Sequence, residues 1–487
     1  MKRATLATTA CALVLSACAS TEQRSFLSDR QAGFATVASR TSAVTGSQPA
    51  WAQSTADVQK NAARVSTLVR GKTIGPDTAV QVALLNNRGL QAAYAEIGLS
   101  SAEVWQTTMR PNPTLSVGLT GLGAEALLVR AIEAAVATNL LALRTQKRRT
   151  AIAETRFRQA QLVAAEATLA VAHETRLAWI NAVAAFEQAQ LIGEAQSTAE
   201  AAAELAAELG RTGFLNAADQ TREFAFESEL AGQRAEARLA ARQAKEALTR
   251  VMGLWGADLD YYVPDRLPAL PAIRPRAKIE AEALTRRVDL AVARLELEAV
   301  AREFDLTEAT RVLSDLDLVT GVEIERERED GATRTAATGR VEIDFPIPIF
   351  DSGEARRRKG ELTYLRAAHQ LAGQAVAVRS EARAAHDAWV GSHEIARHYR
   401  SAVLPLRRQI ERESLLSYNG MITNTFELIA DTRARLGSSQ AEAQARAAFW
   451  RADTALGAAI HGGGSAGSGT GGGAAAPVQA QAGGAGH

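Results

Sequence analysis

The chain has 487 residues, of which only 5% are aromatic, and its 55 basic and 54 acidic residues leave a net charge of +1. A chain of this length commonly forms about three compact domains. Long proline-free stretches rich in Ala, Glu, Arg, Leu and Gln favour long helices instead. The balanced charge gives no reason to expect a nucleic-acid partner.

Residues 1–17 have the features of a signal peptide. Two basic residues precede an apolar stretch, residues 4–15, which is too short to stay in a bilayer as a spanning helix. The motif Leu15-Ser16-Ala17-Cys18 resembles a bacterial lipobox, which predicts a lipid on the thiol of Cys18. An ordinary signal peptide with an incidental cysteine is the alternative. The alanine that follows the cysteine favours sorting of the lipidated chain to the outer membrane.

After a lipidated N-terminal segment, residues 18–76, the sequence is similar to itself at an offset near two hundred. The matching positions are Ala83-Leu84, Leu90, Ala93 and Glu103, which recur as Ala283-Leu284, Leu290, Ala293 and Glu303. We therefore predict two tandem repeats, residues 77–256 and 277–461, joined by a proline-rich linker, residues 257–276. A Gly/Ala-rich tail, residues 462–487, is expected to be disordered.

Each repeat is predicted to contain a helix, a pair of strands, a very long helix, a turn and a last helix. In the first repeat the helices are residues 77–110, 145–209 and 217–252, with Asp77 placed to cap the first. In the second repeat the elements are residues 277–313, 315–345, 353–417 and 425–460, with a turn at 418–424. A helix of about 65 residues is about 100 Å long. A tube across the periplasm needs such helices, whereas a compact domain does not.

The extended segments alternate as membrane strands do. Leu115, Val117 and Leu119 share one face of the first segment. Apolar residues on one face and polar ones on the other are typical of a barrel strand between lipid and water, with a soluble hairpin as the alternative. Residues 131–143 alternate poorly, so a strand and a helical excursion are both open there. Four strands cannot close a barrel and open edges cannot lie in lipid, so copies of the chain must pool their strands.

The segment Phe345-Pro346-Ile347-Pro348-Ile349-Phe350-Asp351-Ser352-Gly353 resembles the strand exit of the TolC-type outer-membrane efflux family. Tyr418-Asn419-Gly420 is similar to the turn at the tip of that family, and the resemblance covers roughly residues 77–460. Proline ends the strand, Asp351 can cap the next helix and Gly353 permits the tilt into it. The resemblance implies a homotrimer with a shared barrel of twelve strands and an α-helical periplasmic barrel with a closable tip. It also implies docking to a periplasmic adaptor and an inner-membrane pump.

The turns at Gly213 and Gly420 are predicted to lie together at the tip, because both follow the longest helices. Asp219 and Glu427 come shortly after these turns and, with threefold symmetry, would form an acidic ring that favours cations. The alternative is that both are solvated acids at helix starts, where the helix dipole favours them. Tyr418 either holds the closed state between neighbouring helices or simply packs. These five residues form the candidate tip gate.

Neither a metal nor a cofactor is predicted. His386 and His393 share a helix face, but they lack the i,i+4 spacing and the further ligands of a metal site. The basic runs Lys147-Arg148-Arg149 and Arg356-Arg357-Arg358 begin the two long helices. We expect them to stay solvated just below the membrane. No catalytic set stands out, so the chain is not expected to be an enzyme.

The predicted fold is therefore mainly α with a small antiparallel β portion: a long α-helical periplasmic barrel, a β-barrel shared between subunits and two tandem structural repeats. The predicted function is that of an outer-membrane channel, lipid-anchored and largely periplasmic, which passively conducts small molecules or ions delivered by a pump. One alternative is the exit channel of a type I protein-secretion system. The other is a lipid-tethered periplasmic helical scaffold without a pore.

Overall fold

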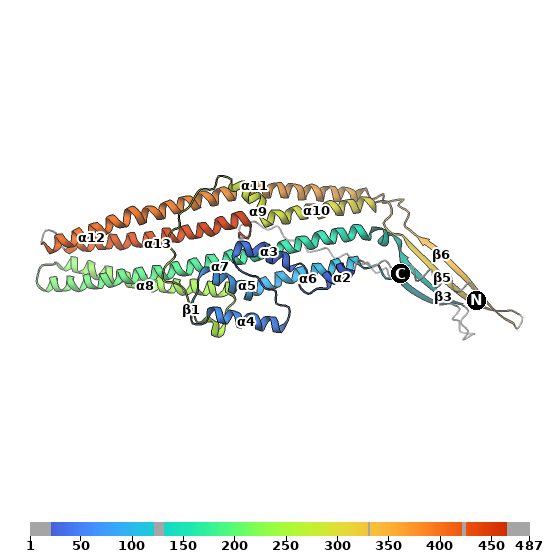
Figure 1. Cartoon of the computed structure of the whole chain (residues 1–487), viewed down its shortest axis with the longest axis horizontal. Helices are drawn as coiled ribbons and strands as arrows, with labels where there is room; N and C mark the ends of the chain where they lie inside the picture. Colours follow the sequence, from blue (N-terminus) through green and yellow to red (C-terminus); the bar gives the residue numbers. More distant parts are fainter. Residues whose placement is uncertain (1–20, 121–130, 330–331, 421–424, 465–487) are drawn as a thin grey trace.

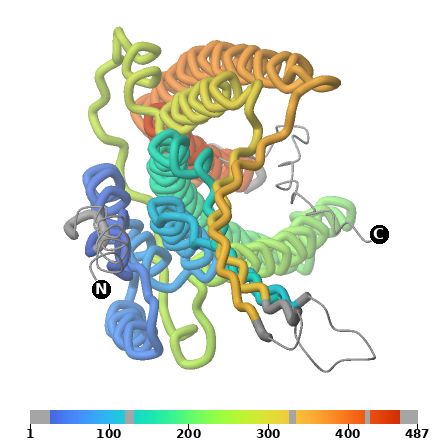
Figure 2. The backbone as a smooth tube through the Cα atoms, turned by 90° about the vertical axis from the view of Figure 1, so that its right-hand side faces the viewer, coloured from blue at the N-terminus to red at the C-terminus, as the bar shows by residue number. Residues whose placement is uncertain are grey.

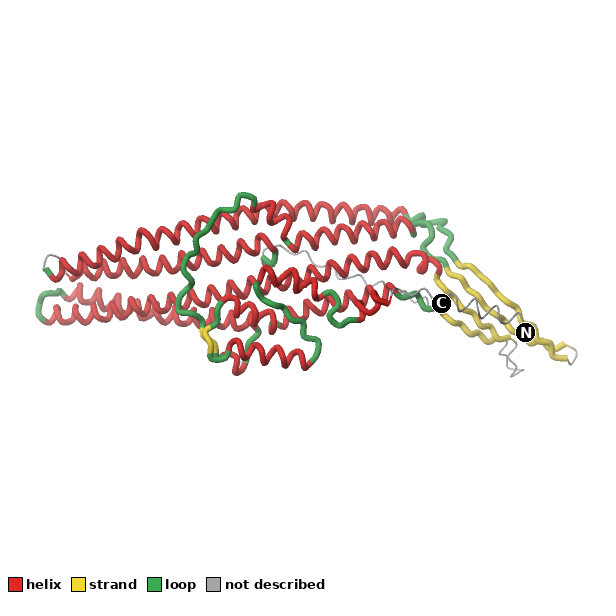
Figure 3. The backbone as a smooth tube through the Cα atoms, in the orientation of Figure 1, coloured by secondary structure: helices red, strands yellow, loops and turns green. Residues whose placement is uncertain are grey.

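The computed structural model describes residues 21–120, 131–329, 332–420 and 425–464. It is an elongated bundle of helices with a four-stranded antiparallel sheet at one end and two helical hairpins at the other (Figure 1, Figure 3). The predicted signal peptide, Cys18 and almost all of the predicted tail lie outside the described residues. The described helices include none that is both long enough and apolar enough to be a membrane span.

The N-terminal segment forms three helices that the sequence analysis does not predict, and they lie on one side of the bundle (Figure 2). These are α2 (Thr21–Ser28), α3 (Phe34–Thr45) and α4 (Thr55–Val69). Phe34 packs edge-on against Tyr94 of the bundle, with ring centroids 5.0 Å apart. A short strand after α4, β1 (Lys72–Thr73), pairs in parallel with β4 (Tyr261–Tyr262), so the segment is fastened at its end as well.

In the first half of the chain, one predicted helix is divided in two. The elements are α5 (Pro76–Asn86), α6 (Arg88–Thr108), β2 (Thr114–Thr120), β3 (Ala131–Asn139), α7 (Leu140–Arg211) and α8 (Ala217–Met252). The division falls at Asn87, whose side chain accepts a hydrogen bond from the Leu90 amide and caps α6. The expected cap by Asp77 is wrong: Gly75 takes the N-cap position, and Asp77 pairs with Arg176 at 2.7 Å.

The poorly alternating segment after the first strand is a strand up to Asn139. There the Asn139 side chain accepts a hydrogen bond from the Ala142 amide and starts α7. The long helix therefore begins five residues earlier than predicted and ends at Arg211. The predicted bounds of α8 agree with the structure.

In the second half, both predicted helices that flank the strands are interrupted. The elements are α9 (Ile279–Arg286), α10 (Val288–Ala309), β5 (Asp317–Glu329), β6 (Ala332–Asp344), α11 (Glu354–His398), η2 (Tyr399–Val403), α12 (Leu404–Asn419) and α13 (Thr425–His461). Arg287 separates α9 from α10. The predicted helix over 353–417 is interrupted by the π-helical η2. Pro405 is the second residue of the helix that follows, α12, and it has no N–H to donate to the preceding turn.

The linker crosses the bundle near its middle (Figure 3). It contains most of the short helix η1 (Gly256–Leu259) and all of β4, and His386 and His393 of α11 bind its later part. The His386 Nε2 accepts a hydrogen bond from the Arg276 amide at 3.1 Å, and the His393 Nε2 lies 2.9 Å from the Pro271 carbonyl oxygen. These two side chains therefore hold the linker against α11 of the second half.

Candidate functional site

The four strands form one sheet in the order β2-β3-β5-β6, and every neighbouring pair is antiparallel. The register aligns side chains of all four strands in rows. One row contains Leu115, Val136, Thr320 and Val341, and the next contains Val117, Ala134, Val322 and Gly339. Each row points to the same face, because alternate residues of a strand share a face.

This face is apolar and uncovered. Leu115, Val117 and Val341 are 69%, 64% and 75% exposed, and Ile343 is exposed as well. In a water-soluble sheet, such a face would be packed against a core. A large exposed apolar patch marks a surface that lies against another protein or a membrane.

The opposite face is acidic. It carries Glu133, Glu323, Glu325, Glu342 and Asp344 from three strands. Arg340 reaches across β5 to Glu133, with Nη1 and Oε1 3.0 Å apart. Gly321 lies between them on β5, where a Cβ would come within 3.1 Å of the Ala135 Cβ. The sheet thus separates an apolar face from a charged one at the same depth.

Within the described residues, the outer strands β2 and β6 each pair with one neighbour. Each therefore presents a row of unpaired backbone N–H and C=O groups along its free edge. The sheet as it stands is an open segment and not a closed barrel.

The strand-to-helix motif forms an exposed extended segment between β6 and α11. Pro346 and Pro348 keep it out of the sheet, and Phe350 is fully exposed. Asp351 is not the N-cap residue, which corrects its predicted role. Gly353 takes that position at φ 78°, and the Asp351 carboxylate accepts a hydrogen bond from the Gly353 amide at 2.8 Å. Any side chain at Gly353 would collide with the Arg311 backbone.

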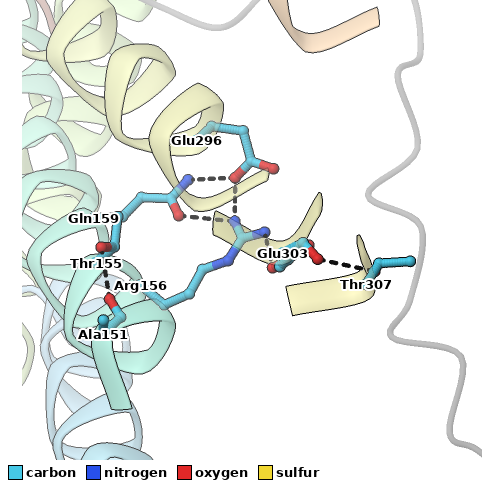
Figure 4. A network of polar contacts seen from close by, with 7 residues as sticks. All are labelled: Ala151, Thr155, Arg156, Gln159, Glu296, Glu303 and Thr307. Carbon is cyan, nitrogen blue, oxygen red and sulfur yellow. Dashed lines mark hydrogen bonds and ion pairs between the residues drawn. The ribbon is translucent and has the colours of Figure 1, made fainter. Parts of the chain in front are cut away.

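Below the sheet, a polar network joins α7 to α10 (Figure 4). Arg156 binds Glu296 and Glu303, and its Nη2 lies 3.0 Å from the Glu303 Oε1. Glu103 and Glu303, which match each other in the sequence, both line a cleft of about 940 Å³ beside this network. The two helices are thus fixed to each other directly below the sheet.

The two predicted turns lie at the same end of the bundle, opposite the sheet (Figure 1). Gly213 has φ 79°, a conformation that favours glycine, whereas Gly420 has φ −80° and does not need it. Asp219 is the third residue of α8. Its carboxylate lies 2.5 Å from Arg222 and accepts a hydrogen bond from Asn216. This is the arrangement of an acid that stabilises its own helix start.

Glu427 lies in the first turn of α13 and is exposed. It lines a hollow of about 680 Å³ between α12 and α13 together with Glu413 and Asp431. Among the residues that the structure describes, no basic side chain lines this hollow. Tyr418 is half-buried at the end of α12. The structure therefore places Asp219 and Glu427 on different hairpins. The i,i+4 spacing of Glu427 and Asp431 is a signal that the sequence analysis misses.

One ion pair near the tip joins the two hairpins and is also missed from sequence. Arg433 of α13 binds Glu223 of α8, and its guanidinium lies 3.6 Å from the centre of the Phe226 ring. Glu223 is only 4% exposed, which makes the pair partly desolvated. It fixes one hairpin against the other.

Among the described residues, no group of three or more His, Cys, Asp or Glu side chains could hold a metal ion. The histidine on α7, His173, is largely buried, and burial lowers its pKa to about 4, so it is neutral at neutral pH.

The sequence matches no protein-family model and no curated protein. The fold, in contrast, is similar to those of solved outer-membrane channels. CusC aligns with TM-score 0.65 and 15% identity over 80% of this chain and 92% of its own. OprN, described as an outer-membrane channel, aligns with TM-score 0.65 and 18% identity over 80% and 90%. The open state of the MtrE outer-membrane channel of Neisseria gonorrhoeae aligns with TM-score 0.62 and 16% identity over 79% and 88%. The chain therefore has the fold of the TolC-type outer-membrane channels.

Proposed function

We propose that this chain is the outer-membrane channel of a tripartite efflux system, which passively conducts small molecules or ions delivered by an inner-membrane pump through a periplasmic adaptor. The sheet would span the outer membrane, and the helical bundle would extend into the periplasm. The observation that carries this proposal is the sheet itself, with an uncovered apolar face, an acidic face and two free edges. A helical scaffold without a pore needs none of these features.

The free edges are the reason to propose an oligomer. Each unsatisfied backbone group in lipid costs several kcal/mol, so an open sheet is not stable there. Three copies would close their sheets into a barrel of twelve strands with the apolar face outside. The acidic face would then line the lumen, which favours cations.

We further propose that the two halves of the chain are tandem repeats. Both halves have two helices, two strands, a long helix and a last helix in the same order. The equivalent turns at Gly213 and Gly420 would then form the gate at the periplasmic tip. Glu427, with Glu413 and Asp431, is the acidic group that would face passing cations, whereas Asp219 mainly supports its own helix. Tyr418 would pack between neighbouring helices in the closed state.

Cys18 is the proposed site of a lipid anchor, on the strength of the lipobox alone. In this arrangement the anchor assists a barrel that spans the membrane by itself. Replacement of Cys18 by alanine should abolish palmitate labelling of the chain and leave conductance in place.

The central test is conductance of the purified protein in planar bilayers. We expect small, cation-preferring currents that rise more in Glu427→Ala than in Asp219→Ala, because Glu427 lies beside Glu413 and Asp431, whereas Asp219 lies beside Arg222. Glu361→Ala, on α11 far from the tip, serves as the control. No conductance in the wild type or in either tip variant would refute the channel function.

A further inference from the structure

The first turns of α7 carry an unusual excess of positive charge. Its first fourteen residues, 140–153, contain four basic and no acidic side chains: Arg144, Lys147, Arg148 and Arg149. The first fourteen residues of α11, 354–367, contain five basic and two acidic side chains. The stretch on α7 directly follows β3, and the stretch on α11 follows β6 after the segment 345–353.

The two basic stretches differ in their partners. On α11, Arg356 lies 3.5 Å from Asp351, Arg357 lies 3.5 Å from Glu308, and Arg358 lies 2.9 Å from Glu361.

On α7, the described residues provide no carboxylate partner for Arg144 or Lys147, and both side chains are exposed. Arg148 donates a hydrogen bond to the backbone carbonyl of Asp305 at 3.1 Å. Three of the five basic side chains on α11 are therefore paired with carboxylates, whereas Arg144 and Lys147 on α7 are not.

Of the three side chains, Lys147 lies on the outer side of the bundle, Arg148 lies toward α10, and Arg144 lies between these two directions on the helix. Lys147 and Gln161 are fourteen residues apart on α7, close to four helical turns, so they share one face. Gln161 contacts the N-terminal segment, since a Cβ on Gly33 would come within 2.8 Å of its Nε2. That side carries α2 to α4 (Figure 2). It faces outward in the proposed tube, because helices on the inner side would fill the lumen.

Their depth corresponds to the headgroup layer. Arg144 and Lys147 lie four and seven residues after the start of α7, which is about 6 and 10 Å along the helix. The polar headgroup region adds about 6 Å on each side of the hydrocarbon core. Long basic side chains can extend toward such a layer while their stems cover the helix.

From these observations, we propose that Arg144, Lys147 and Arg148 bind the phosphate of anionic phospholipids in the periplasmic leaflet of the outer membrane. The site rests on the proposed function, because it takes the sheet as the membrane-spanning part. The i, i+3, i+4 spacing places the three cations around one headgroup. Phosphate is the anion that clusters of Lys and Arg near a membrane attract.

Two acidic residues of α10 lie beside the proposed site, on the side of α7 that faces α10. Asp305 and Glu308 line a hollow of about 510 Å³ between α7 and α10, next to Arg148. Glu308 is already paired with Arg357. The headgroup therefore lies over the first turns of α7 and not in that hollow.

The test is native mass spectrometry of the purified full-length protein titrated with phosphatidylglycerol or phosphatidylethanolamine of the same acyl chains. We expect phosphatidylglycerol to bind more tightly. The double variant R144Q/K147Q should lower its affinity about 25-fold, about fivefold for each basic residue near the surface. The charge-preserving R144K/K147R should retain wild-type affinity, which shows that charge and not a fold defect is responsible.

The matched control is R357Q/R358Q, which removes the same charge from the start of α11, where both side chains are paired. It should stay within about twofold of the wild type. Equal binding of the two lipids by the wild type, or an equal loss in the control variant, would overturn the proposal. So would displacement of the lipid by millimolar inorganic phosphate.

R144Q/K147Q should still conduct in planar bilayers. A chain that prefers phosphatidylglycerol but never conducts would refute the channel and leave the lipid site intact.

Discussion

The long helices of the two halves are built differently. In the first half, α7 is continuous for 72 residues, and 24 of them are buried. In the second half, the corresponding helix is divided by the π-helical η2 into α11 and α12, and Leu404 is the one buried residue of α12. We therefore expect the first half, with its continuous and largely packed α7, to be the rigid part of the molecule. The hairpin α12–α13 is then the part of the tip that can move most easily.

The largest effect is expected from breaking the buried ion pair that joins α7 of the first half to α13 of the second half. Glu187 of α7 is 4% exposed and binds Arg446 of α13, which is 7% exposed. Replacement of Arg446 by methionine leaves a buried carboxylate whose remaining partners are Arg266 of the linker, 3.3 Å away, and the Leu267 amide, 3.4 Å away. We expect a loss of about 3 to 5 kcal/mol in the free energy of unfolding, measured by thermal or chemical denaturation.

Arg451→Gln is the control for that variant, since Arg451 also joins α13 to α7 but binds the uncharged Asn181. It should cost less than about 1 kcal/mol. Equal stabilities of the Arg446→Met variant and the wild type would show that the two halves do not depend on this contact.

A second variant introduces into α7 the kind of interruption that separates α11 from α12. Ser197 of α7 is exposed and lies one residue before the position that corresponds to Pro405, at the offset of 207 between the equivalent turns Gly213 and Gly420. Ser197→Pro removes one hydrogen bond from a continuous helix and should cost about 3 kcal/mol. Ser197→Ala should leave stability nearly unchanged. If Ser197→Pro were as stable as the wild type in denaturation, α7 would not be the rigid element.

The reverse variant, Pro405→Ala, sharpens the same contrast and has the smallest expected effect. It lets the helix regain a backbone hydrogen bond, although η2 already accommodates most of the strain, so we expect a gain of about 1 kcal/mol. In planar bilayers, the channel should spend about fivefold less time open, because the hairpin bends less easily. More frequent opening would contradict a hinge at this point.

Much of this architecture is predictable from sequence, and the failures have identifiable causes. The bounds of α8 follow from the Asn216 cap and from Gly253, which ends the helix at φ 67°. The break at Arg287 has no glycine or proline signal. At this break Arg287 pairs with Asp289, two residues further along, and with Glu381, which only the fold brings close. Pro405, in contrast, is visible in the sequence and predicts the interruption that a purely periodic pattern misses.

The features of the candidate sites likewise fall into those that the sequence predicts and those that only the fold reveals. The two faces of the sheet are readable, because alternation at period two directly reports which side chains share a face. The pair of Arg433 and Glu223 is not readable, since the partners lie 210 residues apart and meet only when the hairpins pack. Sequence therefore indicates the position of the proposed gate more readily than the contacts that join its two hairpins.

If the sheet spans the membrane as proposed, its free edges also set the order in which this protein can mature. A single copy with an open sheet cannot enter the bilayer, whereas its helices can form in the periplasm beforehand. Insertion must then wait for encounters between copies, so its rate should rise steeply with protein concentration. Until that encounter, the exposed edges can pair with any extended chain, and cells that produce this protein at low levels face the longest exposure.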